Sequence, residues 1–238
     1  MENKKNLVKL AEEKKLPLHQ FMDRGTLAWI KKNKPKFGYR KLSLPNKKKI
    51  SQFIPPRSWF LEQKEFDSLH GMRHLLRVAL NCFVLTKKEG YKGNNLLIVA
   101  VLHDIRRKDD KGDEGHGLRT ARWFKKNVDL IQKQFRVDLK KKDVEEIYSC
   151  IFFHEFPQNE LNGNRDYLKF KKSIDLIKLA DALDRYRLPK LSWWINEDLL
   201  ALRIPEVFKK NAFSIVVGSE SLFLQGRGSV ESVVNLLK

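Results

Sequence analysis

Apolar residues recur at the three- and four-residue spacing of an amphipathic helix along most of the chain after residue 56. The clearest example follows Asp67 or Ser68, either of which can cap a helix. Its apolar stripe consists of Leu69, Met72, Leu76, Ala79, Leu80, Phe83 and Val84. No alternation of apolar and polar residues persists long enough to build a sheet. The spacing therefore predicts an all-α protein.

Further helices are expected along the rest of the chain. Helical spacing is found at about 116–132, 143–154, 171–185, 205–214 and 229–238. The run Leu96–Leu102 is wholly apolar, so periodicity alone allows either a buried strand or a buried helix there.

The first quarter of the chain has a different composition. Residues 3–14 and 18–32 show helical spacing, whereas residues 33–56 are rich in Lys, Pro, Gly and Asn and are predicted to form a loop or linker. We therefore expect an N-terminal extension over residues 1–56 and one main domain over residues 57–238.

The 238 residues carry a net charge of +19, and much of it lies at the front: residues 1–60 hold 16 Lys and Arg against 4 Asp and Glu. Such asymmetry indicates an anionic partner, with nucleic acid the first candidate and a merely solvated surface the alternative. Aromatic residues among these lysines could stack on bases or anchor the extension on the main domain. They are Trp29, Phe37, Tyr39 and Phe53.

Three features bear on localisation. Residues 1–15 are charged and lack the apolar core of a secretory signal. The longest apolar run, Leu96–Leu102, is far shorter than the roughly 20 residues that cross a bilayer. Cys82 and Cys150 lie far apart in apolar surroundings and are expected to be buried free thiols. We therefore expect a cytoplasmic protein without a membrane partner.

Histidine placement is the strongest functional signal. Five of the six histidines lie in segments that also contain acidic or glycine residues: His70, His74, His103, His116 and His154. Asp104 directly follows His103 at the end of the apolar run, where adjacent side chains can turn toward one point. Imidazole and carboxylate ligands suit a divalent metal ion, with Mn, Fe, Mg, Ni, Co and Zn all open.

Four segments carry a resemblance to a known family. They read LHGMRHLLRV (69–78), AVLHDIRRKDDKGDEGHGLRTA (100–121), IFFHE (151–155) and LIKLADALDRYRL (176–188). In this order and spacing the chain resembles the HD superfamily of metal-dependent phosphohydrolases, whose defining residues are a His, a His-Asp doublet and a distant Asp. The resemblance covers about half of the chain and implies a helical bundle.

The resemblance also implies which residues bind the metal. The quartet is His74, His103, Asp104 and Asp181. His74 takes the first place because Arg77 and Val78 follow it in the family's pattern. Ligands from three separate helices would leave open positions for water and a phosphate oxygen.

His116 and His154 occupy the places that hold a second metal ion in binuclear members of the family. Many of those members have paired histidines near the second place, whereas here the neighbour of His154 is Glu155. Two interpretations follow: the two histidines bind a second ion, or they contact substrate phosphate around a single ion. One or two divalent ions per chain are therefore expected.

Substrate contacts are expected from His70 and from arginines, because a guanidinium matches phosphate oxygens. The arginines are Arg77, Arg119, Arg185 and Arg187. His70 lies four residues before His74, so both are expected on one helix face, with helix packing as the alternative. For Arg185 a salt bridge to Asp181 is the alternative. The acidic segment 109–114 is expected to be a solvated loop near the site, with acid–base catalysis or metal binding as the alternative.

These residues predict a phosphohydrolase that cleaves a phosphomonoester or phosphodiester, such as a nucleotide, by metal-activated water. Asp104 would orient that water or accept its proton, and His116 and His154 would stabilise charge on the phosphoryl group. A nuclease or nucleic-acid-end phosphodiesterase is a second hypothesis, favoured by the basic extension. A non-hydrolytic HD protein, such as a di-iron oxygenase or a binding module, is a third.

Overall fold

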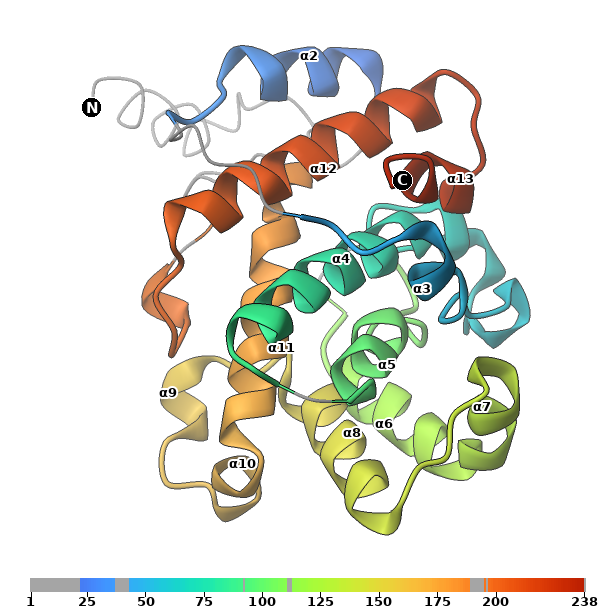
Figure 1. The fold of residues 1–238 in the computed structure, drawn as a ribbon, viewed down its shortest axis with the longest axis vertical. Helices are drawn as coiled ribbons and strands as arrows, with labels where there is room; N and C mark the ends of the chain where they lie inside the picture. The colour runs from blue at the N-terminus through green and yellow to red at the C-terminus, as the bar shows by residue number, and fades with distance from the viewer. Residues whose placement is uncertain are drawn as a thin grey trace.

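The computed structural model describes residues 22–36, 43–91, 93–110, 113–188, 195 and 197–237. Every regular element in these residues is a helix, which confirms the all-α prediction (Figure 1). The α-helices are α2 (Arg24–Lys32), α3 (Lys47–Ser51), α4 (Met72–Lys88), α5 (Asn95–Leu102), α6 (His116–Lys126), α7 (Val128–Phe135), α8 (Lys141–Phe153), α9 (Gln158–Leu161), α10 (Arg165–Lys169), α11 (Lys171–Leu183), α12 (Glu206–Leu224) and α13 (Ser229–Val234). Short 3-10 helices are η1 (Arg57–Trp59), η2 (Gln63–Asp67), η3 (Asp184–Arg187) and η4 (Glu197–Leu199).

Helix α5 lies at the centre of the core. Every residue from Leu96 to Leu102 is buried. A helix that is apolar on all sides is stable only where other elements cover it, and α4, α8 and α11 pack against α5. The run that periodicity left ambiguous is therefore a helix, and its C-terminal end places His103 and Asp104 inside the protein.

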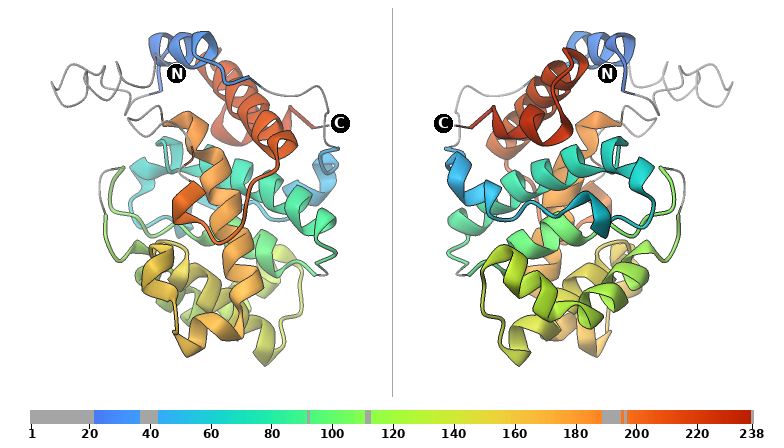
Figure 2. Two further views of the ribbon diagram at one scale, coloured as in Figure 1. Left: turned by 90° about the vertical axis from the view of Figure 1, so that its left-hand side faces the viewer. Right: turned by 90° about the vertical axis from the view of Figure 1, so that its right-hand side faces the viewer.

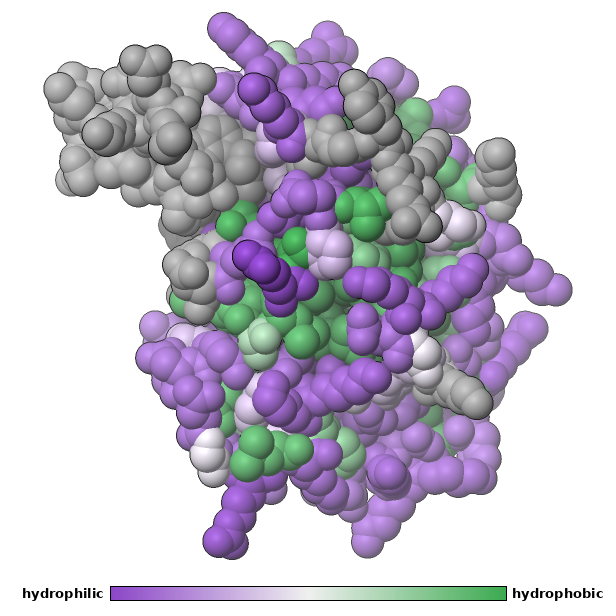
Figure 3. Space-filling model, turned by 60° about the vertical axis from the view of Figure 1, so that its left-hand side comes forward, coloured by the Kyte–Doolittle hydropathy of each residue, from purple (hydrophilic) through white to green (hydrophobic). Residues whose placement is uncertain are grey.

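The other helices surround this centre. Helix α12 packs on α4 and α13, and α2 lies across α12 at one end of the molecule, whereas α6 to α10 lie at the opposite end (Figures 1 and 2). On one face, hydrophobic side chains gather in a central area bordered by hydrophilic ones (Figure 3).

Residues 43–56 are not a simple linker, so the loop prediction is wrong for this part. Helix α3 begins after Asn46, whose side chain accepts a hydrogen bond from the Lys49 backbone N–H at 2.9 Å. Ile50 is buried, and the Phe53 ring packs at 5.5 Å from that of Phe135. Apolar residues between the lysines thus join the main core and hold this segment in place.

Three predictions for the N-terminal region concern residues outside the described part of the chain. They are the helix expected at 3–14 and the aromatic residues Phe37 and Tyr39. Trp29 and Phe53, by contrast, both pack against the core. For these two, the structure agrees with the anchoring interpretation.

The helix expected after Asp67 or Ser68 begins later, at Met72. Neither residue caps it, because both side chains have other partners. The Ser68 hydroxyl donates to Asp110 at 2.9 Å, and the Asp67 carboxylate accepts from the Ser229 hydroxyl at 2.6 Å. These bonds join the segment before α4 to the loop after α5 and to α13.

Two other helices differ from their predicted extents. The segment expected at 116–132 divides into α6 and α7 at Asn127. Helix α12 continues to Leu224, and Glu220, which interrupts the apolar pattern, is buried within it. The Glu220 carboxylate binds Arg73 at 3.1 Å and Arg77 at 2.5 Å. A buried charge needs such partners, and the sequence pattern alone gives no sign of them.

Cys82 and Cys150 are buried free thiols, as predicted. Burial raises the pKa of the Cys82 thiol to about 12. Among the helices of the described residues, none combines the length and the apolar character that crossing a membrane requires.

Candidate metal centre

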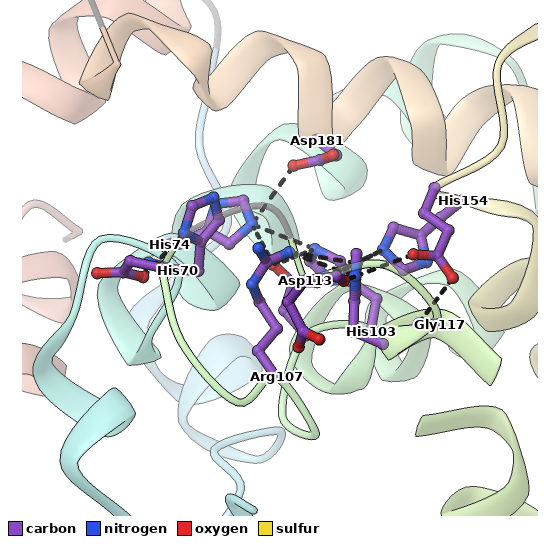
Figure 4. Close-up of polar contacts among 12 residues, drawn as sticks. His70, His74, His103, Arg107, Asp113, Gly117, His154 and Asp181 are labelled. Carbon is purple, nitrogen blue, oxygen red and sulfur yellow. Dashed lines mark hydrogen bonds and ion pairs between the residues drawn. The ribbon is translucent and has the colours of Figure 1, made fainter. Parts of the chain in front are cut away.

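A first group of potential metal ligands joins three elements. His74 comes from α4, His103 from the end of α5 and Asp181 from α11. The His74 Nε2 atom lies 3.3 Å from Asp181 Oδ1 and 3.2 Å from His103 Nε2 (Figure 4). One ligand atom from each residue lies within 4.8 Å of the others, so the group could hold one metal ion.

A second group shares His103 with the first and adds Asp104 and His154. His116, at the start of α6, lies beside it: its Nε2 atom is 3.0 Å from Asp104 Oδ1 and 3.0 Å from His154 Nε2. The structure therefore brings all six predicted ligands together, with Asp104 between the two groups. Their action as ligands stays a prediction.

Two of the histidines are oriented by the same local geometry. His103 and His154 each follow the last residue of a helix, α5 and α8 respectively. Each ring donates from Nδ1 to the carbonyl three residues earlier: His103 to Ala100 at 3.0 Å and His154 to Ile151 at 2.6 Å. Because a carbonyl only accepts, Nδ1 carries a hydrogen in each ring, which leaves Nε2 as the atom that can bind a metal ion.

The other two histidines also use Nδ1 to bind acceptors. His74 Nδ1 lies 2.8 Å from Asp184 Oδ2, and both groups are fully buried. His116 Nδ1 lies 2.7 Å from the Asp113 carbonyl and 2.9 Å from Glu155 Oε2. All four Nε2 atoms therefore face the interior of the cluster, in the orientation that a second acceptor imposes on metal-binding histidines.

Asp104 provides an independent test of whether the cluster fits a metal ion. Its Oδ1 atom is buried and has no hydrogen-bond partner among the described residues. It lies close to His116 and His154 Nε2, but not in hydrogen-bonding geometry. A buried carboxylate oxygen that accepts no hydrogen bond is costly, and a divalent cation bound by the neighbouring imidazoles would offset that cost. The donor set fits a metal ion.

Electrostatics supports the same conclusion. Burial lowers the pKa of His103 to about 4, so this ring is neutral at pH 7. Burial alone would raise the pKa of Asp104, but His103 and His116 outweigh it and keep that pKa well below its usual range. Burial also disfavours charged His116, yet Asp104 and Glu155 raise its pKa to about 10. Without a metal ion, His116 therefore carries a proton, which an ion would displace.

Close packing of α6 on α8 places His116 beside His154. A Cβ atom on Gly117 would lie 2.9 Å from the Ile151 carbonyl, so only glycine permits this approach. The Glu155 carboxylate accepts from the Gly117 N–H at 3.1 Å and also binds His116. Glu155 stands where the resemblance to the HD superfamily would place a second histidine. It accepts a hydrogen bond from a backbone N–H group in the first turn of α6 and orients His116.

A cavity of about 330 Å³ opens beside these groups. Of the predicted substrate contacts, His70, Arg185 and Arg187 line it. His70 lies before α4 rather than on it, so the prediction of a shared helix face with His74 is wrong. Its Nδ1 atom is instead held at 2.8 Å from Asp110.

Arg77 and Arg119 do not line the cavity. Arg77 is fully buried, with Nε 2.6 Å from Asp184 and Nη1 2.5 Å from Glu220, so the predicted phosphate contact is wrong for this residue. Arg119 binds Asp113, and its Nε donates to the Arg106 carbonyl at 3.2 Å. Both arginines stabilise the surroundings of the site instead.

The acidic loop is also more structured than predicted. Asp110 accepts from the Leu69 and His70 backbone N–H groups at 2.9 and 3.0 Å, and Asp113 accepts from the Lys108 N–H at 2.8 Å. These carboxylates tie the loop to the segment before α4 and to itself. They are therefore not a freely solvated rim.

Three residues near the site were not predicted as functional. Asp184 binds His74, while Arg107 and Lys178 line the cavity. A signal for two of them exists in the sequence: Lys178, Asp181 and Asp184 recur every three residues, so charges line one face of an otherwise apolar segment. Arg107 lies in a loop, where no periodicity marks it.

Comparisons of the chain with protein-family models, with curated proteins and with solved structures found no match. The functional assignment therefore depends on the residues of the site and on their geometry.

Proposed function

We propose that the protein is a metal-dependent phosphohydrolase of the HD type. The observation that carries the proposal is the convergence of four imidazole Nε2 atoms around the two oxygens of the buried Asp104 carboxylate, whose Oδ1 accepts no hydrogen bond from the described residues. The His, His-Asp and Asp order in the sequence supports the same assignment. Arg107, Lys178, Arg185 and Arg187 line the cavity beside the cluster, and these basic side chains support a phosphate-bearing substrate.

We further propose two metal ions per chain. The two groups share His103, and the two oxygens of Asp104 face different histidines. Oδ2 lies 3.7 Å from His74 Nε2, and Oδ1 lies 3.0 Å from His116 Nε2. A carboxylate in this position can bridge two ions.

In the proposed reaction, water attacks phosphorus, a new P–O bond forms and the ester P–O bond breaks. The alcohol leaves with a proton. A bound divalent ion would lower the pKa of water and polarise the phosphoryl group. Asp104 is placed to orient the attacking water or to accept its proton. Arg107, Lys178 and Arg185 line the cavity, where their charges favour the phosphoryl oxygens.

Metal analysis combined with a hydrolysis screen tests this function. The purified protein is expected to hold about two divalent ions and to release phosphate or alcohol from nucleotides, phosphomonoesters or phosphodiesters. Asp104→Ala should remove both metal and turnover while circular dichroism shows an intact helical fold. The exposed Asp138 provides the matched control, since Asp138→Ala should change neither. Full turnover in Asp104→Ala would overturn the proposal.

Nucleic acid as the phosphate substrate remains a second candidate because basic side chains are exposed on α2 and α3. They are Lys31, Lys32, Lys47 and Lys48. Because Ile50 and Phe53 belong to the core, the test uses Ala substitutions of these lysines rather than deletion. Binding of labelled RNA or DNA should fall with salt at a log–log slope of ~0.7–0.9 per phosphate contacted. Equal, unselective binding by the wild type and the Ala variant would exclude this candidate.

A further inference from the structure

The lining of the cavity beside the metal centre contains two chemically different sets of residues. One set consists of potential metal ligands and charged groups, and the other is apolar. The apolar set consists of Phe156, Pro157, Ala182, Leu188, Leu199 and Leu200. The volume of about 330 Å³ lies at the lower end of the range for small-molecule sites. A cavity with such a lining fits a ligand that has an anionic part and an apolar part.

Lys178 indicates where the anionic part of a ligand would bind. Its side chain is only 6% exposed, and its Nζ atom donates a hydrogen bond to the Phe156 carbonyl. Among the described residues, no carboxylate lies within ion-pair distance of this Nζ, whereas the neighbouring Arg187 is paired with Asp184 at 3.2 Å. An ammonium group has three hydrogens to donate, and a buried charge without a counter-ion is costly. Lys178 therefore has no counter-ion among the described residues, and an anionic group bound in the cavity could provide one.

The charge balance around Lys178 agrees with this conclusion. Burial lowers the pKa of Lys178, and the carboxylates of Asp175 and Asp181 offset this effect only in part. A phosphate in the cavity would add the missing negative charge and favour the ammonium form.

The apolar residues of the lining indicate what the rest of the ligand would be. Leu199 is 50% exposed. It is one of three large hydrophobic residues that are exposed in the described part of the chain. None of the six apolar side chains offers a hydrogen-bond donor or acceptor. Sugar hydroxyls placed there would lose water without gaining a partner, whereas an apolar group would gain contact area. The apolar residues of the lining therefore favour an apolar or aromatic group on the ligand.

We propose that the cavity binds a phosphate ester of an apolar or aromatic alcohol. Its phosphate would lie beside Lys178 and its carbon part against Phe156, Leu199 and Leu200. Hydrolysis of this ester rests on the phosphohydrolase function proposed above, whereas the binding mode itself does not require hydrolysis.

Non-hydrolysable ligands test the binding mode without turnover. Phenylphosphonate, naphthylphosphonate and 2-hydroxyethylphosphonate carry the same anionic group on different carbon parts. Isothermal titration of the metal-loaded protein is expected to show the tightest binding for naphthylphosphonate. It should show at least about tenfold weaker binding for 2-hydroxyethylphosphonate, because apolar contact area sets the difference. Equal or tighter binding of 2-hydroxyethylphosphonate would overturn the proposal.

Two variants separate the ends of the ligand. Lys178→Met should weaken all three phosphonates at least about tenfold, and Lys178→Arg should restore part of that loss. Leu199→Ser should weaken only the two aryl ligands. Lys172→Met is the matched control, because Lys172 is an exposed lysine of the same helix and should have no effect. Unchanged phosphonate affinity in a folded, metal-loaded Lys178→Met variant would contradict the role of Lys178.

The outcomes also distinguish this inference from the proposed function. Aryl phosphonate binding that depends on Lys178 and Leu199, in a protein without hydrolytic activity, would support the binding mode and refute the hydrolase. Conversely, the protein could hydrolyse polyhydroxylated phosphate esters with the same KM as aryl esters, and Leu199→Ser could leave both KM values unchanged. This result would support the hydrolase and refute the binding mode.

Discussion

Replacing Asp184 by Asn tests how far the metal centre depends on a carboxylate behind it. Asp184 Oδ2 accepts a hydrogen bond from His74 Nδ1 at 2.8 Å, and both groups are fully buried. An Asn of the same shape loses the charge and can turn an N–H group toward the ring, which would move the histidine proton to Nε2. Changes in such outer partners typically lower metal affinity 10–100-fold, about 1.4–2.8 kcal/mol.

The same change also affects stability, so it needs a control. Asp184 binds Arg77 at 2.6 and 3.1 Å, and Arg77 has Glu220 as its other carboxylate partner. Breaking a buried pair costs about 3–5 kcal/mol, and Asn keeps one acceptor oxygen, so about 3 kcal/mol is expected. Glu220→Gln disturbs the same network without touching His74. Both variants should be destabilised, but only Asp184→Asn should bind metal weakly.

Two measurements separate these effects. Metal affinity is measured by competition with a chromophoric chelator. The free energy of unfolding is measured in urea with excess chelator, because bound metal would itself stabilise the folded state. Equal metal affinities in Asp184→Asn and Glu220→Gln would refute the positioning of His74 by Asp184.

Four further predictions concern His116, His154 and the packing that holds them together. His116→Ala and His154→Ala should each lower the metal content from about two ions to about one, as measured by mass spectrometry of the metal. The raised pKa of His116, about 10, predicts that metal binding at pH 7 releases about one proton and weakens as pH falls, which titration calorimetry in two buffers of different ionisation enthalpy can measure. In the metal-free protein, the raised pKa of His116 stabilises the fold, and this contribution is fully present below the ordinary histidine pKa. It should be lost as pH rises through about 10. The free energy of unfolding should therefore fall with pH over this range in the wild type but not in His116→Ala. Gly117→Ala should separate α6 from α8, because its Cβ would lie 2.9 Å from the Ile151 carbonyl, and should lower both the melting temperature and the metal content; an unchanged metal content would contradict the close-packing argument.

The helical class could be predicted from the sequence because it depends on local patterns, whereas the convergence of histidines far apart in the chain was predicted only through the resemblance to the HD superfamily. Apolar spacing indicated most helices, and the position of His103 and Asp104 after an apolar run indicated a buried pair. The helix itself could not be distinguished from a strand there, since an apolar run has no period. Its neighbours on every side decide the question.

Pairings between distant charges could not be predicted. Arg77 looked like a phosphate contact, yet Asp184 and Glu220 neutralise it in the interior. The partner Glu220 lies 143 residues away, so no spacing rule relates the two. Lys178 was overlooked for a related reason: its missing counter-ion is visible only once the helices are packed.

Anomalous X-ray scattering from crystals grown with Mn²⁺ or Zn²⁺ locates bound metal ions without any assay of activity. We expect one peak bonded to His74, His103 and Asp181, a second bonded to His116 and His154, and Asp104 between them. Well-ordered crystals with no peak among these six side chains, or with ions bound only elsewhere, would contradict this prediction.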